Sequence, residues 1–203
     1  EAAEQKLKQK LLAQGAVPDR FEVPLLKMRA EAEIYREENL PLLIQEHKLS
    51  MEYDKIVGAQ TVQWDGEEIT VVQLRPIYQS IDRHLRESAW RVAAQRQLDD
   101  RGSIDRLWEE FMGVRAKLAA NAGFHEYRSY RWKQLLRFDY TPEDCRRFHE
   151  AIEEVVVPAA ARLCEPRRKL LSVKKLRPWD LDVDPLGRPP LASQRDTVTR
   201  PPS

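Results

Sequence analysis

A histidine followed directly by a glutamate occurs twice in the chain, at His125-Glu126 and at His149-Glu150. This dipeptide opens the zinc-binding pattern of many metallopeptidases, in which a second histidine four residues later puts both imidazoles on one helix face. The residues at those two later positions are Ser129 and Glu153. Neither pair completes a zinc site, and the sequence contains no His-x3-His pair.

Both histidines have other roles open to them. His125 could share a metal ion with Glu126 or with the Glu109-Glu110 pair, but this spacing fits no standard ligand set, so a structural or surface histidine is favoured. His149 lies four residues before Glu153 on a predicted helix, where a contact between the two side chains is the favoured role. The sequence therefore assigns no catalytic and no metal-binding residue, and the substrate-binding residues stay unknown.

The chain contains two cysteines, Cys145 and Cys164. Cys145 falls in the first turn of a predicted helix, where the helix dipole can lower a thiol pKa, but no histidine is placed to act as its base. Both cysteines fall in one predicted helix, roughly 28 Å apart along its axis, so they cannot pair within it. We therefore expect reduced thiols and a cytoplasmic location.

Residues 162–177 contain seven basic residues and one acidic residue. A phosphate or RNA patch is one interpretation. A solvated helix end is favoured, because lysine and arginine suit the negative end of the helix dipole and the whole chain has a net charge of only +1. No apolar run approaches the roughly 20 residues that span a bilayer. We predict neither a nucleic-acid nor a membrane partner.

Five aromatic residues gather between the predicted helices in the second half of the chain. They could line a groove for a peptide, but such residues more often fill a helical core, which is the favoured interpretation. The five are Tyr127, Tyr130, Trp132, Phe138 and Tyr140.

The elements that position these residues are mostly helices. The chain has 203 residues, of which 33% are charged and only seven are glycine, a composition typical of long amphipathic helices. We expect a mainly-α fold, a helical bundle or half-shell with one short β-hairpin near residues 60–72. Asp65-Gly66 suits the type I′ turn of that hairpin, because both central residues of such a turn need positive φ. A break is expected near Pro41.

The helices of the second half have clear apolar patterns. Residues 81–92 form a helix whose expected buried face turns Arg86 away and carries Ile81, Leu85, Ala89 and Val92. A second long helix starts at Ser103, and residues 104–118 carry apolar side chains at three- and four-residue spacing. Thr141 is a predicted N-cap with Asp144 in a box-like position three residues later, and residues 148–163 carry an apolar row. Pro158 should kink that last helix.

We divide the chain into four parts on these patterns. Residues 1–58 form N-terminal helices, 59–74 the hairpin insert and 75–180 a helical scaffold. Residues 181–203 are a proline-rich tail that we expect to be disordered, most clearly from about residue 192.

Six segments together resemble the oligoendopeptidase F family of thimet-oligopeptidase-like zinc metallopeptidases. The resemblance covers roughly residues 5–191, and each segment is weak evidence alone. The segments are WDGEEITV at 64–71, DRHLRESAW at 82–90, AANAGFHEYRSY at 119–130, FDYTPED at 138–144, VVVPAAARL at 155–163 and LRPWDLDV at 176–183.

The resemblance implies a large helical shell of two halves around a channel that admits short peptides. In this family two histidines of His-Glu-x-x-His and a later glutamate bind zinc, and the glutamate of the motif is the general base. Further histidine and tyrosine residues stabilise the intermediate. None of these residues maps onto this sequence, so zinc is implied for a full-length member and no cofactor for this chain.

We therefore expect the N-terminal scaffold portion of an oligoendopeptidase, inactive by itself. Two alternatives stay open, a non-catalytic helical interaction module derived from the family and a helical nucleic-acid-binding protein. Helices that form half a shell should expose apolar surface, so a homodimer is also expected.

Overall fold

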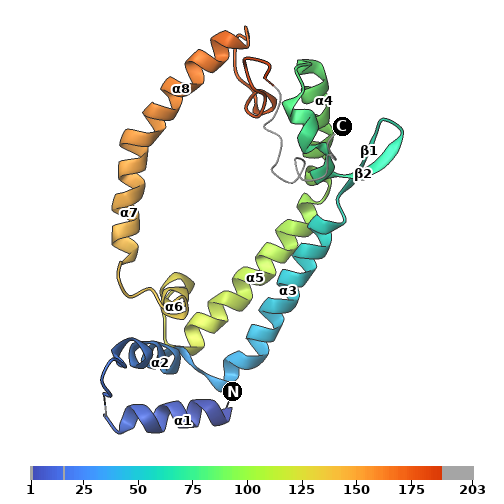
Figure 1. Cartoon of the computed structure of the whole chain (residues 1–203). Helices are drawn as coiled ribbons and strands as arrows, with labels where there is room; N and C mark the ends of the chain where they lie inside the picture. The colour runs from blue at the N-terminus through green and yellow to red at the C-terminus, as the bar shows by residue number, and fades with distance from the viewer. Residues whose placement is uncertain (1, 16, 189–203) are drawn as a thin grey trace, which may run out of the picture. The chain divides into compact units, whose positions relative to one another are not determined.

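The chain forms eight α-helices and one two-stranded β-hairpin within residues 2–15 and 17–188, the part that the computed structural model describes (Figure 1). The expected mainly-α fold with one hairpin is confirmed. The chain divides into two compact units, which are described one at a time. Unit 1 comprises Glu1–Gly58 and Arg101–Phe148, and unit 2 comprises Ala59–Asp100 and His149–Ser203.

Unit 1 is built around two long helices, α3 and α5, which lie side by side and run in opposite directions (Figure 1). Pro41 is the second residue of α3, where a proline is tolerated, so the expected break falls just before this helix. The elements of this unit are α1 (Ala2–Ala13), α2 (Glu22–Ile34), the 3-10 helix η1 (Glu37–Asn39), α3 (Leu40–Gly58), α5 (Arg101–Asn121), α6 (Tyr127–Gln134) and most of α7 (Pro142–Ala151).

The core of unit 1 lies between α3, α5 and α6. The apolar pattern predicted for α5 is confirmed for Leu107, Val114 and Leu118, which are buried. Trp108 belongs to the same pattern but is 57% exposed, because it lies one residue, or about 100° around the helix, from Leu107 in the buried row. The buried members of the core are Ile34, Leu49, Leu107, Val114, Leu118, Ala119, Ala122 and Tyr130.

A polar contact crosses this core at Asn39, the last residue of η1, which is 1% exposed. Its side-chain amide donates a hydrogen bond to the backbone carbonyl of Leu118 at 3.0 Å. Its carbonyl oxygen accepts one from the Asn121 side chain at 2.8 Å. Since Leu118 and Asn121 belong to the last turn of α5, Asn39 fixes the start of α3 against the end of α5.

Unit 2 combines the hairpin with α4 and the C-terminal helices. Asp65 has φ 51° and Gly66 φ 82°, so the predicted type I′ turn is confirmed. Val62 of the hairpin is buried against Leu74 and Ala89. The elements are β1 (Thr61–Trp64), β2 (Glu67–Thr70), the 3-10 helix η2 (Val71–Gln79), α4 (Arg83–Asp99), the π-helix η3 (Ile152–Val156), α8 (Val157–Leu170) and the 3-10 helix η4 (Pro178–Asp180).

The buried face of α4 differs from the predicted one. Ile81 is 77% exposed and Leu85 40% exposed, whereas Arg86 is only 2% exposed. The helix buries Ala89, as the pattern predicts, together with Arg86 and Ala93. The prediction that Arg86 lies on the surface is wrong, because its guanidinium has hydrogen-bond partners inside the fold.

The start of α7 has the predicted cap. The Asp144 amide donates to the Thr141 hydroxyl at 3.2 Å, and the Thr141 amide donates to the Asp144 carboxylate at 2.8 Å, which closes a reciprocal box. The Thr141 hydroxyl also donates to that carboxylate. These bonds, with help from Arg147, lower the pKa of Asp144 to about 2.

The helical stretch from α7 to α8 buries no residue. Its apolar row does not become a buried face, since Val155, Val156 and Leu163 are each more than half exposed. The interruption that Pro158 predicts takes the form of η3, a wide turn in which the Val157 amide donates to the Ile152 carbonyl five residues back. Pro158 has no amide hydrogen, and a wider turn just before it rearranges the bonding of the helix.

Residues 181–188 of the proline-rich tail are described, and Val183 among them is 3% exposed. The remainder of the predicted tail, from residue 189, lies outside the described residues. None of the helices in the described part is long and apolar enough to cross a membrane.

Replacing Asn39 with alanine should destabilise unit 1. The change removes the hydrogen bonds of Asn39 to the Leu118 carbonyl and from the Asn121 amide, and losing such bonds in a buried place lowers the free energy of unfolding by roughly 1–3 kcal/mol. Urea unfolding followed by circular dichroism measures the change. Gln45→Ala, at an exposed position on α3, is the matched control and should shift the midpoint little. Equal midpoints for the two variants would contradict the assigned role.

Candidate functional site

The His125-Glu126 pair lies in the connection between α5 and α6, and both residues are exposed. Glu126 precedes α6 and accepts hydrogen bonds from the Arg128 side chain and the Ser129 hydroxyl, each at 3.2 Å. Ser129 stands at the position that a second histidine would occupy, and its hydroxyl bonds the residue that precedes α6. Glu126 acts here as an acceptor for α6.

The His149-Glu150 pair lies on α7, where both side chains are exposed. The expected contact between His149 and Glu153 stays a prediction. Across the described ranges 2–15 and 17–188, no three His, Cys, Asp or Glu side chains come together as a metal site would require.

The two cysteines are free thiols. Cys145 is half-buried in the first turn of α7, and Cys164 is exposed on α8.

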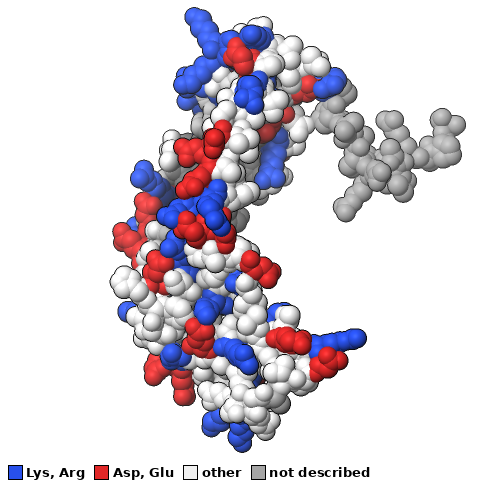
Figure 2. All heavy atoms as spheres, turned by 90° about the vertical axis from the view of Figure 1, so that its left-hand side faces the viewer, with Lys and Arg blue, Asp and Glu red and all other residues white. Residues whose placement is uncertain are grey.

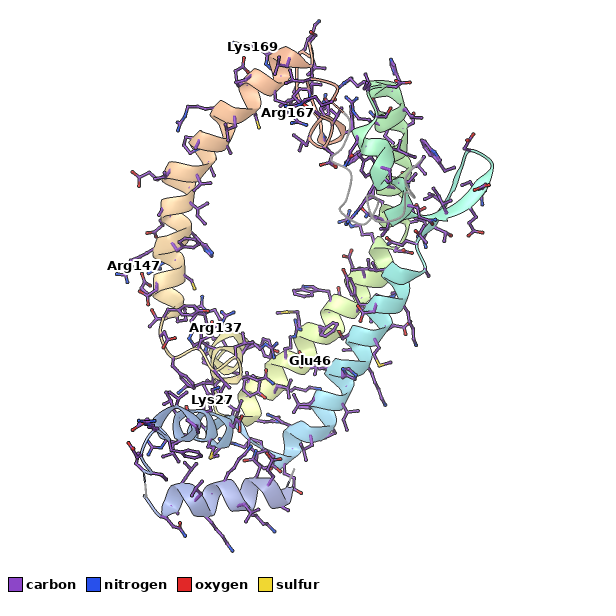
Figure 3. All side chains as sticks on the ribbon, viewed as in Figure 1. Lys27, Glu46, Arg137, Arg147, Arg167 and Lys169 are labelled. Atoms are coloured by element: carbon purple, nitrogen blue, oxygen red, sulfur yellow. The ribbon has the colours of Figure 1, made fainter. Side chains whose placement is uncertain are left out.

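The five aromatic residues divide between the core of unit 1 and its surface. Tyr130 is 2% exposed and meets the Phe124 ring edge-on at 6.0 Å. Trp132 and Tyr140 form a second edge-on pair, with their ring centres 5.2 Å apart. The guanidinium of Arg137, which is labelled in Figure 3, lies 4.8 Å from the centre of the Trp132 ring. Tyr140 is 43% exposed and Phe138 38% exposed, so core packing accounts for only part of the cluster.

The basic stretch 162–177 uses several of its cations within unit 2. Arg168 pairs with Glu165 at 2.8 Å and donates to the Val173 carbonyl at 3.0 Å. Arg167 donates to the backbone carbonyl of Asp180 at 2.9 Å. Figure 2 views the side of the chain that carries α7 and α8. Basic side chains gather at the top of this view, and acidic and basic side chains are mixed over the rest of it.

A fully buried charged group of unit 2 is Asp180, which is 0% exposed. Arg83 holds its carboxylate with two parallel hydrogen bonds, from Nε at 2.9 Å and from Nη2 at 3.0 Å. Arg86 donates to the same carboxylate from Nη2 at 3.1 Å, and the Arg177 amide donates to it at 3.0 Å. This arrangement joins α4 to η4 through a buried ion pair.

Backbone carbonyls complete the network. Arg86 donates from Nε to the Trp179 carbonyl at 2.8 Å, and from Nη1 to the Ser80 carbonyl at 2.8 Å. Arg167 donates to the carbonyls of Leu181 and Val183 as well as that of Asp180, and Figure 3 shows it near the end of α8. The loop after η4 is therefore attached to both α4 and α8.

Trp179 closes the same region from the apolar side. Its ring packs on Trp90 at 5.3 Å, with the Arg91 guanidinium 5.2 Å from it. Its indole Nε1 is buried and has no hydrogen-bond partner among the described residues. The Asp180 network, defined as Arg83, Arg86, Arg167, Trp179 and Asp180, thus combines a buried ion pair with aromatic packing.

The sequence model of peptidase family M3 matches residues 77–184, which is more than half of the chain and contains the whole Asp180 network. The chain belongs to peptidase family M3. The comparison with curated protein sequences gives no match.

Solved structures of other proteins share the fold of this chain. PZ peptidase A with an inhibitor has a TM-score of 0.83 and 26% identity, covering 96% of this chain and 37% of that one. A structure described as an oligoendopeptidase F has a TM-score of 0.83 and 25% identity, covering 96% and 37%. Another oligoendopeptidase F, from Bacillus anthracis, has a TM-score of 0.79 and 22% identity, covering 89% and 34%. This chain spans about a third of the length of these proteins.

The Asp180 network of this M3 chain was not predicted from the sequence, although a signal was present. Arg83 and Arg86 are three residues apart, a spacing that puts both on one face of a helix, and Asp180 follows a proline and a tryptophan. What the sequence does not show is that these residues, more than 90 positions apart, meet in the fold.

Replacing Asp180 with asparagine should destabilise unit 2. The change leaves the buried Arg86 without its counter-charge, and breaking a buried ion pair from one side costs roughly 3–5 kcal/mol. The free energy of unfolding in urea is the measurement. Asp182→Asn, two residues away at an exposed position, is the matched control. A loss below about 1 kcal/mol, the range of a surface ion pair, would contradict the assigned role.

The same carboxylate should make stability depend on pH. Burial raises the pKa of Asp180, but the hydrogen bonds from Arg83, the Arg177 amide and Arg86 together outweigh it and lower the net pKa. A group with a lowered native pKa stabilises the fold above its unfolded value of about 3.9, and this contribution is lost as pH falls through the native value. The stability difference between wild type and Asp180→Asn should therefore shrink when the urea titration is repeated below about pH 4. An unchanged difference would refute the lowered pKa.

Proposed function

We propose that this chain is the scaffold portion of an oligoendopeptidase-like M3 zinc metallopeptidase that hydrolyses short peptides. The observation that carries the proposal is the family M3 match over residues 77–184. Two structural relatives at 25% and 26% identity are described as an oligoendopeptidase F and as PZ peptidase A. The likeness to these proteins extends over 96% of this chain, so it includes both units.

The residues that the structure describes do not fit a zinc site. No set of three metal-ligating side chains forms within the described residues, and neither His-Glu pair has a second histidine. We therefore place the zinc ligands and the general base of the proposed parent enzyme outside the described residues of this chain. We assign this chain a part in holding the shape of the enzyme and no step in the chemistry.

A non-catalytic interaction module is the second candidate. It is favoured by the exposed apolar side chains of α7, η3 and α8, such as Val156 and Leu163, which offer a surface to another polypeptide. Self-association of this chain stays a prediction. A reading frame that continues into His-Glu-x-x-His would eliminate this candidate in favour of the proposed enzyme.

The remaining expectations about partners and location are also proposals. Nucleic-acid binding by residues 162–177 is disfavoured, since Arg167 and Arg168 are bonded to backbone and to Glu165. The proposed cytoplasmic location rests on Cys145 and Cys164, which are free thiols.

This polypeptide by itself should bind no stoichiometric zinc and cleave no peptide. Metal analysis after dialysis against zinc, together with an assay on a quenched fluorescent peptide, checks both points. A chelator separates metal-dependent cleavage from a contaminating protease. One zinc ion per chain, or chelator-sensitive cleavage that copurifies with the protein, would refute the scaffold assignment.

A further inference from the structure

A hollow in unit 1 lies along α3 and α5 and has an apolar part and a polar part. Tyr53, Leu107 and Trp108 line the apolar part. Phe111 and Arg115 line both parts, so the two parts adjoin at these residues. Trp108 is 57% exposed, and a large ring left open to solvent beside a hollow is a natural contact for an apolar group.

The polar part of the hollow is lined by charged side chains from three helices. Glu46 and His47 come from α3, Arg115 from α5 and Arg131 from α6. With His47 neutral, the positive charges of Arg115 and Arg131 and the negative charge of Glu46 sum to one positive charge. The hollow therefore favours a ligand with a single negative charge.

Arg115 is held in one position by its neighbours. Its Nε donates to the Glu46 carboxylate at 2.7 Å, and the Tyr127 hydroxyl donates to the same oxygen at 3.1 Å. Its guanidinium lies 4.6 Å from the Phe111 ring and 5.2 Å from the Tyr127 ring. Glu46, labelled in Figure 3, lies where α3 approaches α5. A guanidinium fixed in this way loses little further freedom when a ligand binds.

The outer end of this guanidinium is available. Within residues 2–15 and 17–188, neither Nη1 nor Nη2 of Arg115 makes a hydrogen bond, and the side chain is 27% exposed. The two Nη groups form a planar fork that matches the two oxygens of a carboxylate. Arg115 and Trp108 both line the apolar part of the hollow, and the Arg115 guanidinium lies 5.9 Å from the centre of the Trp108 ring.

We propose that this hollow binds the C-terminal residue of a short peptide, with its free carboxylate on the Nη fork of Arg115 and a large apolar side chain against Trp108. The carboxylate is inferred from the Nη donors of Arg115 that the described residues leave free, and the apolar group from the exposed Trp108 ring. The choice of a peptide as the molecule that carries them rests on the proposed function. Arg131 adds positive charge beside the carboxylate without touching the apolar side chain.

Isothermal titration of the full chain with two peptides tests the carboxylate. Acetyl-Ala-Ala-Phe with a free C-terminus should bind at least about tenfold more tightly than the same peptide with a C-terminal amide, because the amide cannot accept two charge-assisted hydrogen bonds. Acetyl-Ala-Ala-Ser with a free C-terminus should also bind more weakly, because serine leaves Trp108 uncovered. Equal binding of acid and amide, or no binding of the acid at millimolar concentration, would overturn the proposal.

Variants assign the binding to this hollow. Arg115→Lys should weaken binding of the acid peptide by about tenfold or more, because an ammonium offers no planar fork. Trp108→Ala should weaken it as well, while Met112→Ala, on the same helix and 50% exposed, should not. Arg131→Gln should weaken binding more than Arg128→Gln, its exposed neighbour on α6.

Two features keep the test decisive. Arg115 also contacts Glu46, so Arg115→Lys could unfold, which circular dichroism would show. In that case the test rests on two comparisons, Trp108→Ala with Met112→Ala and Arg131→Gln with Arg128→Gln. Equal effects on binding within both comparisons refute the site. Binding is measured on this chain without cleavage. Failure of the site therefore appears as absent or unselective titration, whereas failure of the proposed function appears as zinc or peptidase activity in this polypeptide.

Discussion

The Asp180 carboxylate is buried against the side chains of two arginines, Arg83 and Arg86, and the organisation of unit 2 follows from that burial. A buried charge without a partner costs several kcal/mol, so Asp180 can be buried only where Arg83 and Arg86 reach it from α4. Those bonds fix η4 on α4. Arg167 then donates to the carbonyl of Asp180 and so attaches α8 to the same point.

Local chemistry was sufficient to predict several elements. Asp65-Gly66 predicted its turn because few residues adopt positive φ, and Thr141 predicted its cap because its hydroxyl reaches an amide three residues on. The Pro41 position followed from the missing amide hydrogen of proline. In each case the cause and the effect lie within four residues, so the sequence alone contains the whole interaction.

Long-range pairing explains what the sequence did not reveal. The polarity pattern put Arg86 on the surface of α4, because the residue that neutralises it lies 94 positions later. Arg115 was equally invisible as a binding residue, since Glu46 and Tyr127 reach it from two other helices. The apolar row of α7 and α8 failed for the opposite reason, because periodicity indicates an apolar face but not whether the described chain supplies a partner for it.

Arg86 and Arg115 show how the use of donors separates a structural arginine from one prepared for a ligand. Arg86 is 2% exposed, and Nε, Nη1 and Nη2 all donate to acceptors of the fold. Arg115 is fixed as firmly by Glu46 and by aromatic rings, but only its Nε is used. A ligand on Arg86 would have to displace hydrogen bonds of the fold, whereas the proposed carboxylate would take Nη donors of Arg115 that the described fold leaves unused.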